Sequence, residues 1–173
     1  LDQGTPKQMG LKQVVQAFCE FRETVITRRT RHLLTKARDR AHILAGLMVA
    51  LASIDEVIAL IRRAPDAETA RHELTGRDWP AAEVEGFINL IDDPGHMVTD
   101  GKYRLSETQA RAILELRLQR LTGMERDKLA EETGELAEKI KEYLSILSSR
   151  EHLTRIMLEE LAATKTIMDN PRR

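Results

Sequence analysis

The sequence is poor in the residues that mark several classes of protein. Trp, Tyr and Phe together make up 3% of the 173 residues, and Cys19 is the single cysteine, which excludes an internal disulfide. No apolar run approaches the roughly 20 residues of a membrane-spanning helix. We see no signal peptide and no glycine-rich phosphate loop. We therefore expect a cytoplasmic protein with no membrane partner and no nucleotide site in this chain.

What the chain has instead is helix-forming composition and balanced charge. It is rich in Ala, Leu, Glu, Arg and Ile, and its net charge is −1, which argues against wholesale nucleic-acid binding. The charge is unevenly placed: residues 1–53 carry nine Lys/Arg against four Asp/Glu, and residues 54–121 carry nine against thirteen. The first residue is not Met, and we interpret the chain as a piece of a larger protein.

Residues 11–52 predict one very long helix, because Gly46 is the one glycine in that range and no proline occurs there. Such a helix would span roughly 60 Å, too long for the core of a compact domain of this size. Its apolar residues form two seams with three- and four-residue steps, as in coiled coils. The first seam is Leu11, Val14, Phe18, Phe21 and Val25; the second is Leu34, Ala37, Ala41, Leu44, Met48 and Leu51.

Short helices are predicted after this long one. Ser53 with Glu56 has the pattern of a capping box, and Pro65 should stop the helix that it begins. Asp66 should cap a third helix that runs to about Leu74. Trp79-Pro80 should open a fourth. Residues 92–102 predict a turn-rich loop, and residues 103–105 a short extended piece.

The stretch 103–125 contains two further capping-box patterns, Ser106 with Gln109 and Thr122 with Glu125. The helix between them is apolar on more than one side, which predicts burial on more than one side. Its leucines either pack inside this chain or face a second copy. A long return helix should follow over residues 124–147, with a third seam. Ser148 with Glu151 should cap a final helix that ends near Met168.

These elements predict an all-α fold. Two long antiparallel helices should form a coiled-coil stalk that carries a small helical globular head, which we expect to pair with a second copy. We expect a connector at 1–10, the first stalk helix at 11–53, the head at 54–121, the return helix at 122–147 and a C-terminal helix at 148–173.

Several runs resemble the A subunit of DNA gyrase, a type IIA topoisomerase: V-I-T-R-R-T-R (25–31), K-A-R-D-R-A-H-I-L-A-G-L (36–47), I-D-E-V-I-A-L-I-R (54–62) and the long run from Leu105 to Glu125. The A-R-D-R-A-H pattern favours gyrase over the A subunit of topoisomerase IV, although that alternative stays open. At Ser53 the family more often has Asn. A second alternative is a helical coiled-coil adaptor without enzymatic activity.

The resemblance implies a bacterial, ATP-hydrolysing topoisomerase in which this region is the stalk and the DNA exit gate, or C-gate. Two heads would meet across a two-fold axis and release the transported duplex when they part. The partners implied are a second copy, the B subunit of gyrase, and double-stranded DNA passing through transiently. ATP and Mg would be held by the B subunit, with no cofactor in this chain.

No catalytic residue is expected here. Tyr103 and Tyr143 do not match the family's nucleophile motif, and we interpret both as structural. The five histidines show no ligand spacing along the sequence that would indicate a metal, and Asp39 with His42 suggests an exposed polar pair.

Two groups of residues are the candidate sites. The gate and dimer-interface candidates are Leu105, Gln109, Ile113, Leu114, Leu116 and Leu118. The basic stretch includes Arg28, Arg29, Arg31, Lys36 and Arg38. It either lines a cavity for duplex DNA, with phosphate contacts and no base readout, or is a solvated helix with ion pairs.

Overall fold

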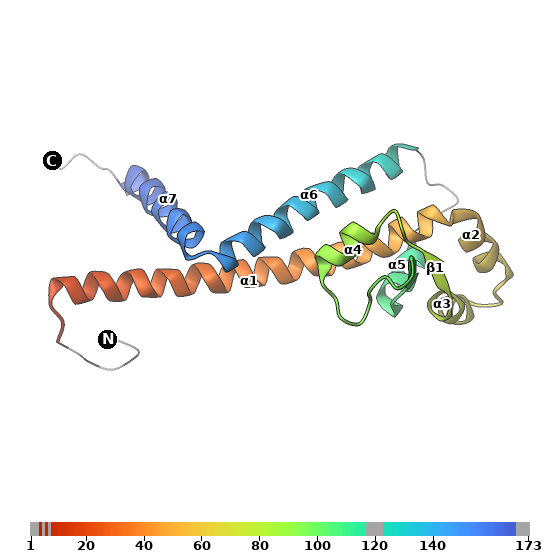
Figure 1. Ribbon diagram of the computed structural model, residues 1–173, viewed down its shortest axis with the longest axis horizontal. Coiled ribbons are helices and arrows are strands. Elements are labelled where there is room, and N and C mark those ends of the chain that lie inside the picture. Colours follow the sequence, from red (N-terminus) through yellow and green to blue (C-terminus); the bar gives the residue numbers. More distant parts are fainter. Residues whose placement is uncertain (1–3, 5, 7, 117–122, 169–173) are drawn as a thin grey trace. The chain divides into compact units, whose positions relative to one another are not determined.

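The computed structural model describes residues 4, 6, 8–116 and 123–168 (Figure 1). Its contacts divide the chain into two compact units: unit 1 comprises residues 1–34 and 142–173, and unit 2 comprises residues 35–141. Both boundaries fall inside long helices. Over these described residues the fold is all-α, as the sequence predicts, apart from one two-stranded sheet.

Helix α1, Leu11–Ala52, is the predicted long helix. Its second apolar seam is well covered, since Leu34, Ala37, Ala41 and Leu44 are buried. The first seam is largely uncovered: Leu11 is 82% exposed, Phe21 64% and Phe18 48%. The N-terminal part of α1 thus presents apolar side chains that the described chain does not bury.

Helix α6, Gly123–Ser148, is the predicted return helix. Within unit 2 it runs opposite to α1 (Figure 1), and two contacts tie them together. The Arg40 guanidinium donates to both Glu132 carboxylate oxygens at 2.7 and 2.9 Å. The Thr133 hydroxyl lies 3.3 Å from the sulfur of Met48. The predicted antiparallel pairing is confirmed within this unit.

Helix α2, Ile54–Arg63, leaves the end of α1 at a 92° angle. The predicted capping box at Ser53 is wrong, because its side chain makes no cap hydrogen bond and its φ of −120° and ψ of 37° depart from the extended backbone of an N-cap. Helix α3, Ala67–Gly76, begins as predicted: the Asp66 carboxylate accepts from the Thr69 backbone N–H at 2.7 Å.

The predicted helix start at Trp79-Pro80 is wrong. Strand β1, Asp78–Pro80, pairs antiparallel with β2, Lys102–Arg104, and places Trp79 opposite Tyr103. Both aromatic side chains are 1% exposed, and the indole N–H of Trp79 donates to the carbonyl of Leu74 at 2.9 Å. Burial of this ring therefore overrides the local helix signal of Pro80. The predicted extended piece at 103–105 is confirmed at Tyr103 and Arg104, which lie in β2.

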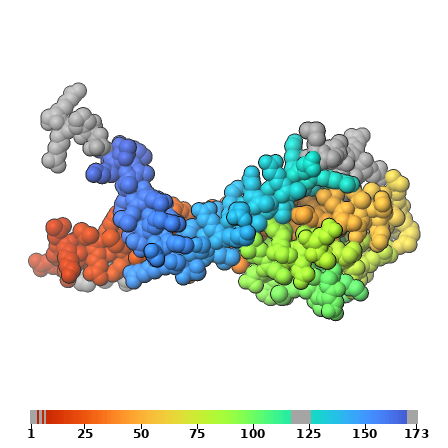
Figure 2. Space-filling model, turned by 45° about the horizontal axis from the view of Figure 1, so that its top comes forward, coloured from red at the N-terminus to blue at the C-terminus, as the bar shows by residue number. Residues whose placement is uncertain are grey.

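Helix α4, Glu85–Ile91, and helix α5, Glu107–Glu115, complete unit 2. In the space-filling view, residues of α2 to α5 form one mass with the end of α1 (Figure 2). The core of this mass is apolar and includes Val49, Val57, Leu60, Leu74, Ile88, Ile91, Leu105 and Ile113. The predicted loop at 92–102 is confirmed up to Gly101, and β2 begins at Lys102.

Helix α7, Arg150–Met168, packs in unit 1 through charged contacts with α1. The Glu160 carboxylate accepts from Arg22 at 2.6 Å and also from Arg29. Ser148 does not cap α7, contrary to prediction, because α6 continues through it. The Ser149 hydroxyl instead accepts from the His152 backbone N–H at 3.4 Å.

Among the described residues, no single helix has both the length and the apolarity of a membrane span, whereas the bent pair of α1 and α2 meets that test when taken together.

Candidate functional site

A buried polar centre joins α1 to α5 in unit 2, and Gln109 is its middle residue. Its side chain is fully buried, its oxygen accepts from the Ser106 backbone N–H at 2.9 Å, and its amide nitrogen donates to the His42 carbonyl at 2.6 Å and to the Tyr103 hydroxyl at 2.8 Å. The Gln109 backbone N–H donates back to the Ser106 hydroxyl. The predicted capping box is confirmed, and it also fastens α5 to another helix.

Gly46 makes room for this arrangement. A Cβ atom built on Gly46 would lie 2.6 to 2.8 Å from the Cβ, Cγ and Cδ atoms of Gln109. Since real Cβ atoms do not approach that closely, α1 and the Gln109 side chain can meet here because position 46 has no side chain.

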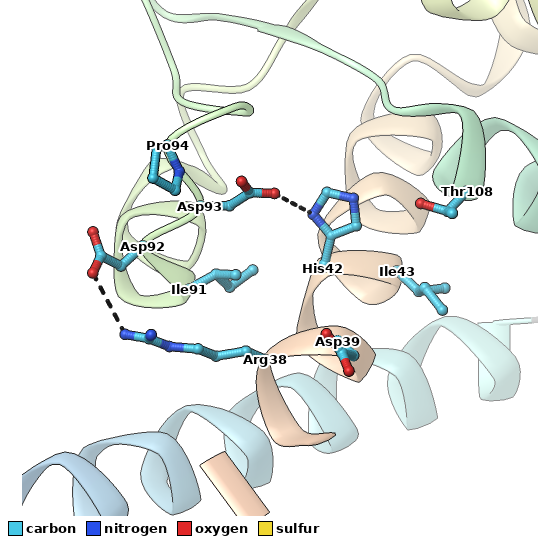
Figure 3. A pocket seen from close by; sticks show the side chains of 9 residues that line it. All are labelled: Arg38, Asp39, His42, Ile43, Ile91, Asp92, Asp93, Pro94 and Thr108. Carbon is cyan, nitrogen blue, oxygen red and sulfur yellow. Dashed lines mark ion pairs between the residues drawn. The ribbon is translucent and has the colours of Figure 1, made fainter. Parts of the chain in front are cut away.

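Next to this centre lie His42, Asp93 and His96, which we call the histidine cluster. One ligand-type atom from each lies within 4.8 Å of the others. His42 Nδ1 is 3.4 Å from an Asp93 carboxylate oxygen (Figure 3). On the other side of the ring, His42 Nε2 is 2.8 Å from the Ser106 hydroxyl. Burial lowers the pKa of His42, and the neighbouring His96 lowers it further against the opposing effect of Asp93 and Asp39.

The prediction that Asp39 and His42 form an exposed polar pair is therefore wrong for His42. Its side chain is only 16% exposed, and its contacts go to Asp93 and Ser106. Sequence spacing could not indicate this cluster because His42 lies on α1, whereas Asp93 and His96 come from the loop after α4. A search for ligands within one helix or one short motif misses such a set.

A cavity of about 500 Å³ opens beside the cluster (Figure 3). The Arg38 guanidinium in its wall is turned toward Asp92, 3.6 Å away. The cavity is lined by Arg38, Asp39, His42, Ile43, Ile91, Asp92, Asp93, Pro94 and Thr108.

The interface candidates fall into different environments. Leu105 is 2% exposed, and Gln109 and Ile113 are fully buried, so these three are interior residues of unit 2 and offer no surface to a second copy in this conformation. Leu114 and Leu116 are partly exposed. Leu118 and the predicted cap at Thr122 lie outside the described residues.

The basic candidates also differ from one another. Arg29 pairs with Glu160, and Arg38 pairs with Asp92, so the interpretation as a helix with ion pairs describes these two. Arg28 and Lys36 are exposed, and no ion pair to either is found within the described ranges. Arg28 and Arg31 both line a groove of about 640 Å³ in unit 1, between α1 and the junction of α6 and α7.

The two tyrosines lie in different elements, Tyr103 in β2 and Tyr143 in α6. Burial raises the pKa of the Tyr103 hydroxyl, and that hydroxyl accepts from Gln109. A group so enclosed cannot reach a phosphodiester in this conformation. Tyr143 is partly exposed on α6.

Comparison with known proteins shows similarity to A subunits of DNA gyrase and topoisomerase IV over nearly the whole chain. The family profile of the DNA gyrase/topoisomerase IV A subunit matches residues 1–162. The DNA gyrase A subunit of Granulibacter bethesdensis is 53% identical over 100% of this chain, and that of Rickettsia bellii is 50% identical over 99%. The DNA gyrase A subunit of Pseudomonas aeruginosa is 41% identical over 98%.

The chain spans 18% of the length of the Granulibacter protein and 19% of the other two. It covers a short region of each relative, but the match runs across both units of its own structure. The chain therefore belongs to the family of DNA gyrase and topoisomerase IV A subunits.

Proposed function

We propose that this chain is the exit-gate region of the A subunit of a type IIA topoisomerase that moves one DNA duplex through another. Its role is mechanical: two copies pair through unit 2, and parting of the pair releases the transported duplex. The observation that carries this proposal is the family match over both units, in a chain whose buried Tyr103 is unavailable as a nucleophile.

The holoenzyme partners follow from the same family membership and are part of the proposal. They are a second copy of this chain's parent protein, the B subunit of gyrase, and double-stranded DNA. ATP hydrolysis with Mg belongs to the B subunit, and the complex would act in the bacterial cytoplasm. The A subunit of topoisomerase IV is the second candidate, because the family profile includes the corresponding subunits of both enzymes.

The surface between α3 and α5 is suited to a two-fold contact. It forms a cavity of about 520 Å³ that is lined by Ala67, Glu68, Arg71, Arg111, Leu114 and Glu115. A two-fold axis brings the same patch of each copy together, so the patch must complement itself. Leu114 supplies apolar area between two arginines and two glutamates, which lets opposite charges meet across the axis.

Analytical ultracentrifugation of the chain at micromolar concentration tests the gate proposal. We expect a monomer–dimer equilibrium that Leu114→Asp shifts toward monomer, because a buried unpaired carboxylate is costly at an interface. Leu158→Asp is the matched control, since Leu158 is 59% exposed on α7 in unit 1.

A wild-type chain that stays strictly monomeric would contradict dimerisation through this region. If the chain forms a dimer that neither variant weakens, the gate proposal stands but the α3–α5 surface is not the contact between the two copies. Circular dichroism of each variant separates loss of pairing from loss of folding.

A further inference from the structure

We propose that the histidine cluster of His42, Asp93 and His96 is a binding site for a divalent transition-metal ion of the zinc class. The site would hold one ion with two imidazole nitrogens, one carboxylate oxygen and water. It lies within unit 2 and is independent of the proposed gate function.

The spacing of the ligand atoms fits such an ion. Zinc bonds to nitrogen and oxygen at about 2.0–2.1 Å, which places neighbouring ligands in a tetrahedron roughly 3.4 Å apart. His42 Nδ1 and the Asp93 carboxylate oxygen are 3.4 Å apart. The ligand atoms of all three residues lie within 4.8 Å of one another, so an ion would draw the set together to tetrahedral spacing.

Each histidine also has an outer partner that orients its ring. His96 Nδ1 is 3.3 Å from the Arg104 carbonyl. A carbonyl can only accept, so Nδ1 carries the proton and the neutral ring keeps its lone pair on Nε2. His42 Nε2 contacts the Ser106 hydroxyl, which leaves Nδ1 on the side of Asp93. Metal-binding histidines are commonly held by such carbonyl or polar contacts.

These outer partners are themselves held in place. Arg104 is in β2, where it pairs in register with Asp78 of β1, and Ser106 is fixed by its capping box with Gln109. The rings are therefore oriented by elements that belong to the core of unit 2, rather than by surface side chains.

The charge and the cavity beside the histidine cluster favour a bound cation that keeps one coordination position open to water. Asp39 adds negative charge to the wall of the 500 Å³ cavity beside the cluster. The nearby cation Arg38 is directed toward Asp92, as Figure 3 shows. The cavity leaves room for water as a fourth ligand.

The donor set selects the class of ion. Two imidazoles and one carboxylate suit Zn²⁺, Co²⁺ or Ni²⁺, whereas Mg²⁺ and Ca²⁺ favour oxygen ligands alone. A bound ion would link the loop after α4 to α1, since His42 and the other two ligands come from these two segments.

Titration of the metal-free chain with Zn²⁺ and Co²⁺ tests the site. We expect one ion per chain, the visible absorption of four-coordinate Co²⁺, and a higher Tm in Zn²⁺ but not in Mg²⁺. His96→Ala and Asp93→Asn should lose the absorption and the Tm shift. Asn at position 93 keeps an oxygen for the Gly95 backbone N–H, which Asp93 now accepts at 3.0 Å.

His72→Ala is the matched control, because His72 is an exposed histidine of α3 in the same unit and outside the cluster. It should bind as the wild-type chain does. Ser106→Ala should weaken binding 10- to 100-fold, about the effect of removing an outer partner, with circular dichroism as the check on folding. A folded wild-type chain that binds neither ion, or equal binding by His96→Ala and wild type, would overturn the proposal.

Discussion

Gly46 shows how one residue can serve packing at the expense of helix propensity. It lies inside α1, where glycine is about 1 kcal/mol less favourable than alanine. A methyl group there would meet the Cβ and Cγ atoms of Gln109 at 2.7 and 2.6 Å. These atoms are near the backbone of α5 and cannot turn aside like the end of a flexible side chain.

We predict that Gly46→Ala lowers the free energy of unfolding, because overpacking costs typically about 1–3 kcal/mol and exceeds the gain in helix propensity. Gly134→Ala is the matched control in α6, where nothing lies within 4 Å of the added Cβ, and it should stabilise by about 1 kcal/mol. Urea unfolding of both variants provides the measurement; stabilisation by Gly46→Ala would show that the helices separate easily at this point.

Gln109 should be the polar residue of unit 2 most sensitive to substitution, since it is fully buried and makes three side-chain hydrogen bonds. We predict that Gln109→Leu destabilises by about 1–3 kcal/mol for each buried partner left unpaired. Gln16→Leu, at an exposed position of α1, is the control. Equal unfolding free energies for the two variants would contradict a central role for Gln109.

At the scale of elements, the start of α7 distinguishes two adjacent serines. Ser149 accepts from the His152 N–H, whereas the Ser148 hydroxyl donates to the Ser145 carbonyl inside α6. We predict that Ser149→Ala lowers stability by about 0.5–1 kcal/mol and that Ser148→Ala has a smaller effect. Thermal unfolding followed by the circular-dichroism signal of the helices compares the two variants. A larger loss of stability for Ser148→Ala than for Ser149→Ala would support the capping box predicted from sequence.

The contact between α1 and α6 in unit 2 should depend on pH. The hydrogen bond from Arg40 lowers the pKa of Glu132 below its ordinary 4.5. The unfolded chain therefore takes up this proton first as the pH falls, so the stabilisation is present above 4.5 and is lost through the lower folded-state pKa. Because both side chains are substantially exposed, we expect only about 0.2–1 kcal/mol.

Glu132→Gln should thus lower stability at neutral pH and lose its effect in strong acid. Glu131→Gln is the control, since Glu131 is exposed and no ion pair to it is found in the described part of the chain. Urea unfolding at neutral and acidic pH gives the comparison. If Glu132→Gln lowers the free energy of unfolding by the same amount at acidic and at neutral pH, the proposed role of this ion pair is contradicted.

At the scale of the whole molecule, the proposed function makes Arg28 and Lys36 the basic candidates to test for contact with DNA. Both are exposed, while Arg29 and Arg38 already pair with carboxylates. We predict that Arg28→Glu with Lys36→Glu weakens duplex binding by the chain. The slope of log affinity against log salt should fall by about 0.9 for each phosphate that the variant no longer neutralises.

Arg62→Glu with Arg77→Glu, at two exposed positions of unit 2, controls for the change in net charge. Binding measured by fluorescence anisotropy over a range of salt concentrations distinguishes the pairs. If both double variants lose the same affinity, the attraction comes from overall charge and not from the basic stretch of α1.

Patterns within a single segment were the most predictable part of this protein. The absence of proline over residues 11–52 and the recurring three- and four-residue steps are sufficient to predict α1 and α6, because helix periodicity is a local property. Asp66 and the Ser106–Gln109 pair were predictable for the same reason. Their hydrogen bonds join residues three positions apart.

Tertiary contacts determined what those local patterns could not. Trp79 lies in a strand because Tyr103 pairs opposite it and the Leu74 carbonyl accepts a hydrogen bond from its indole N–H. Leu105 and Ile113 are core residues because the fold of unit 2 buries them, although an apolar side chain in sequence does not reveal what covers it. The sequence by itself determined the long helices α1 and α6 and the family, whereas the fold alone brought His42 to Asp93 and His96, since contacts between distant segments have no local signature.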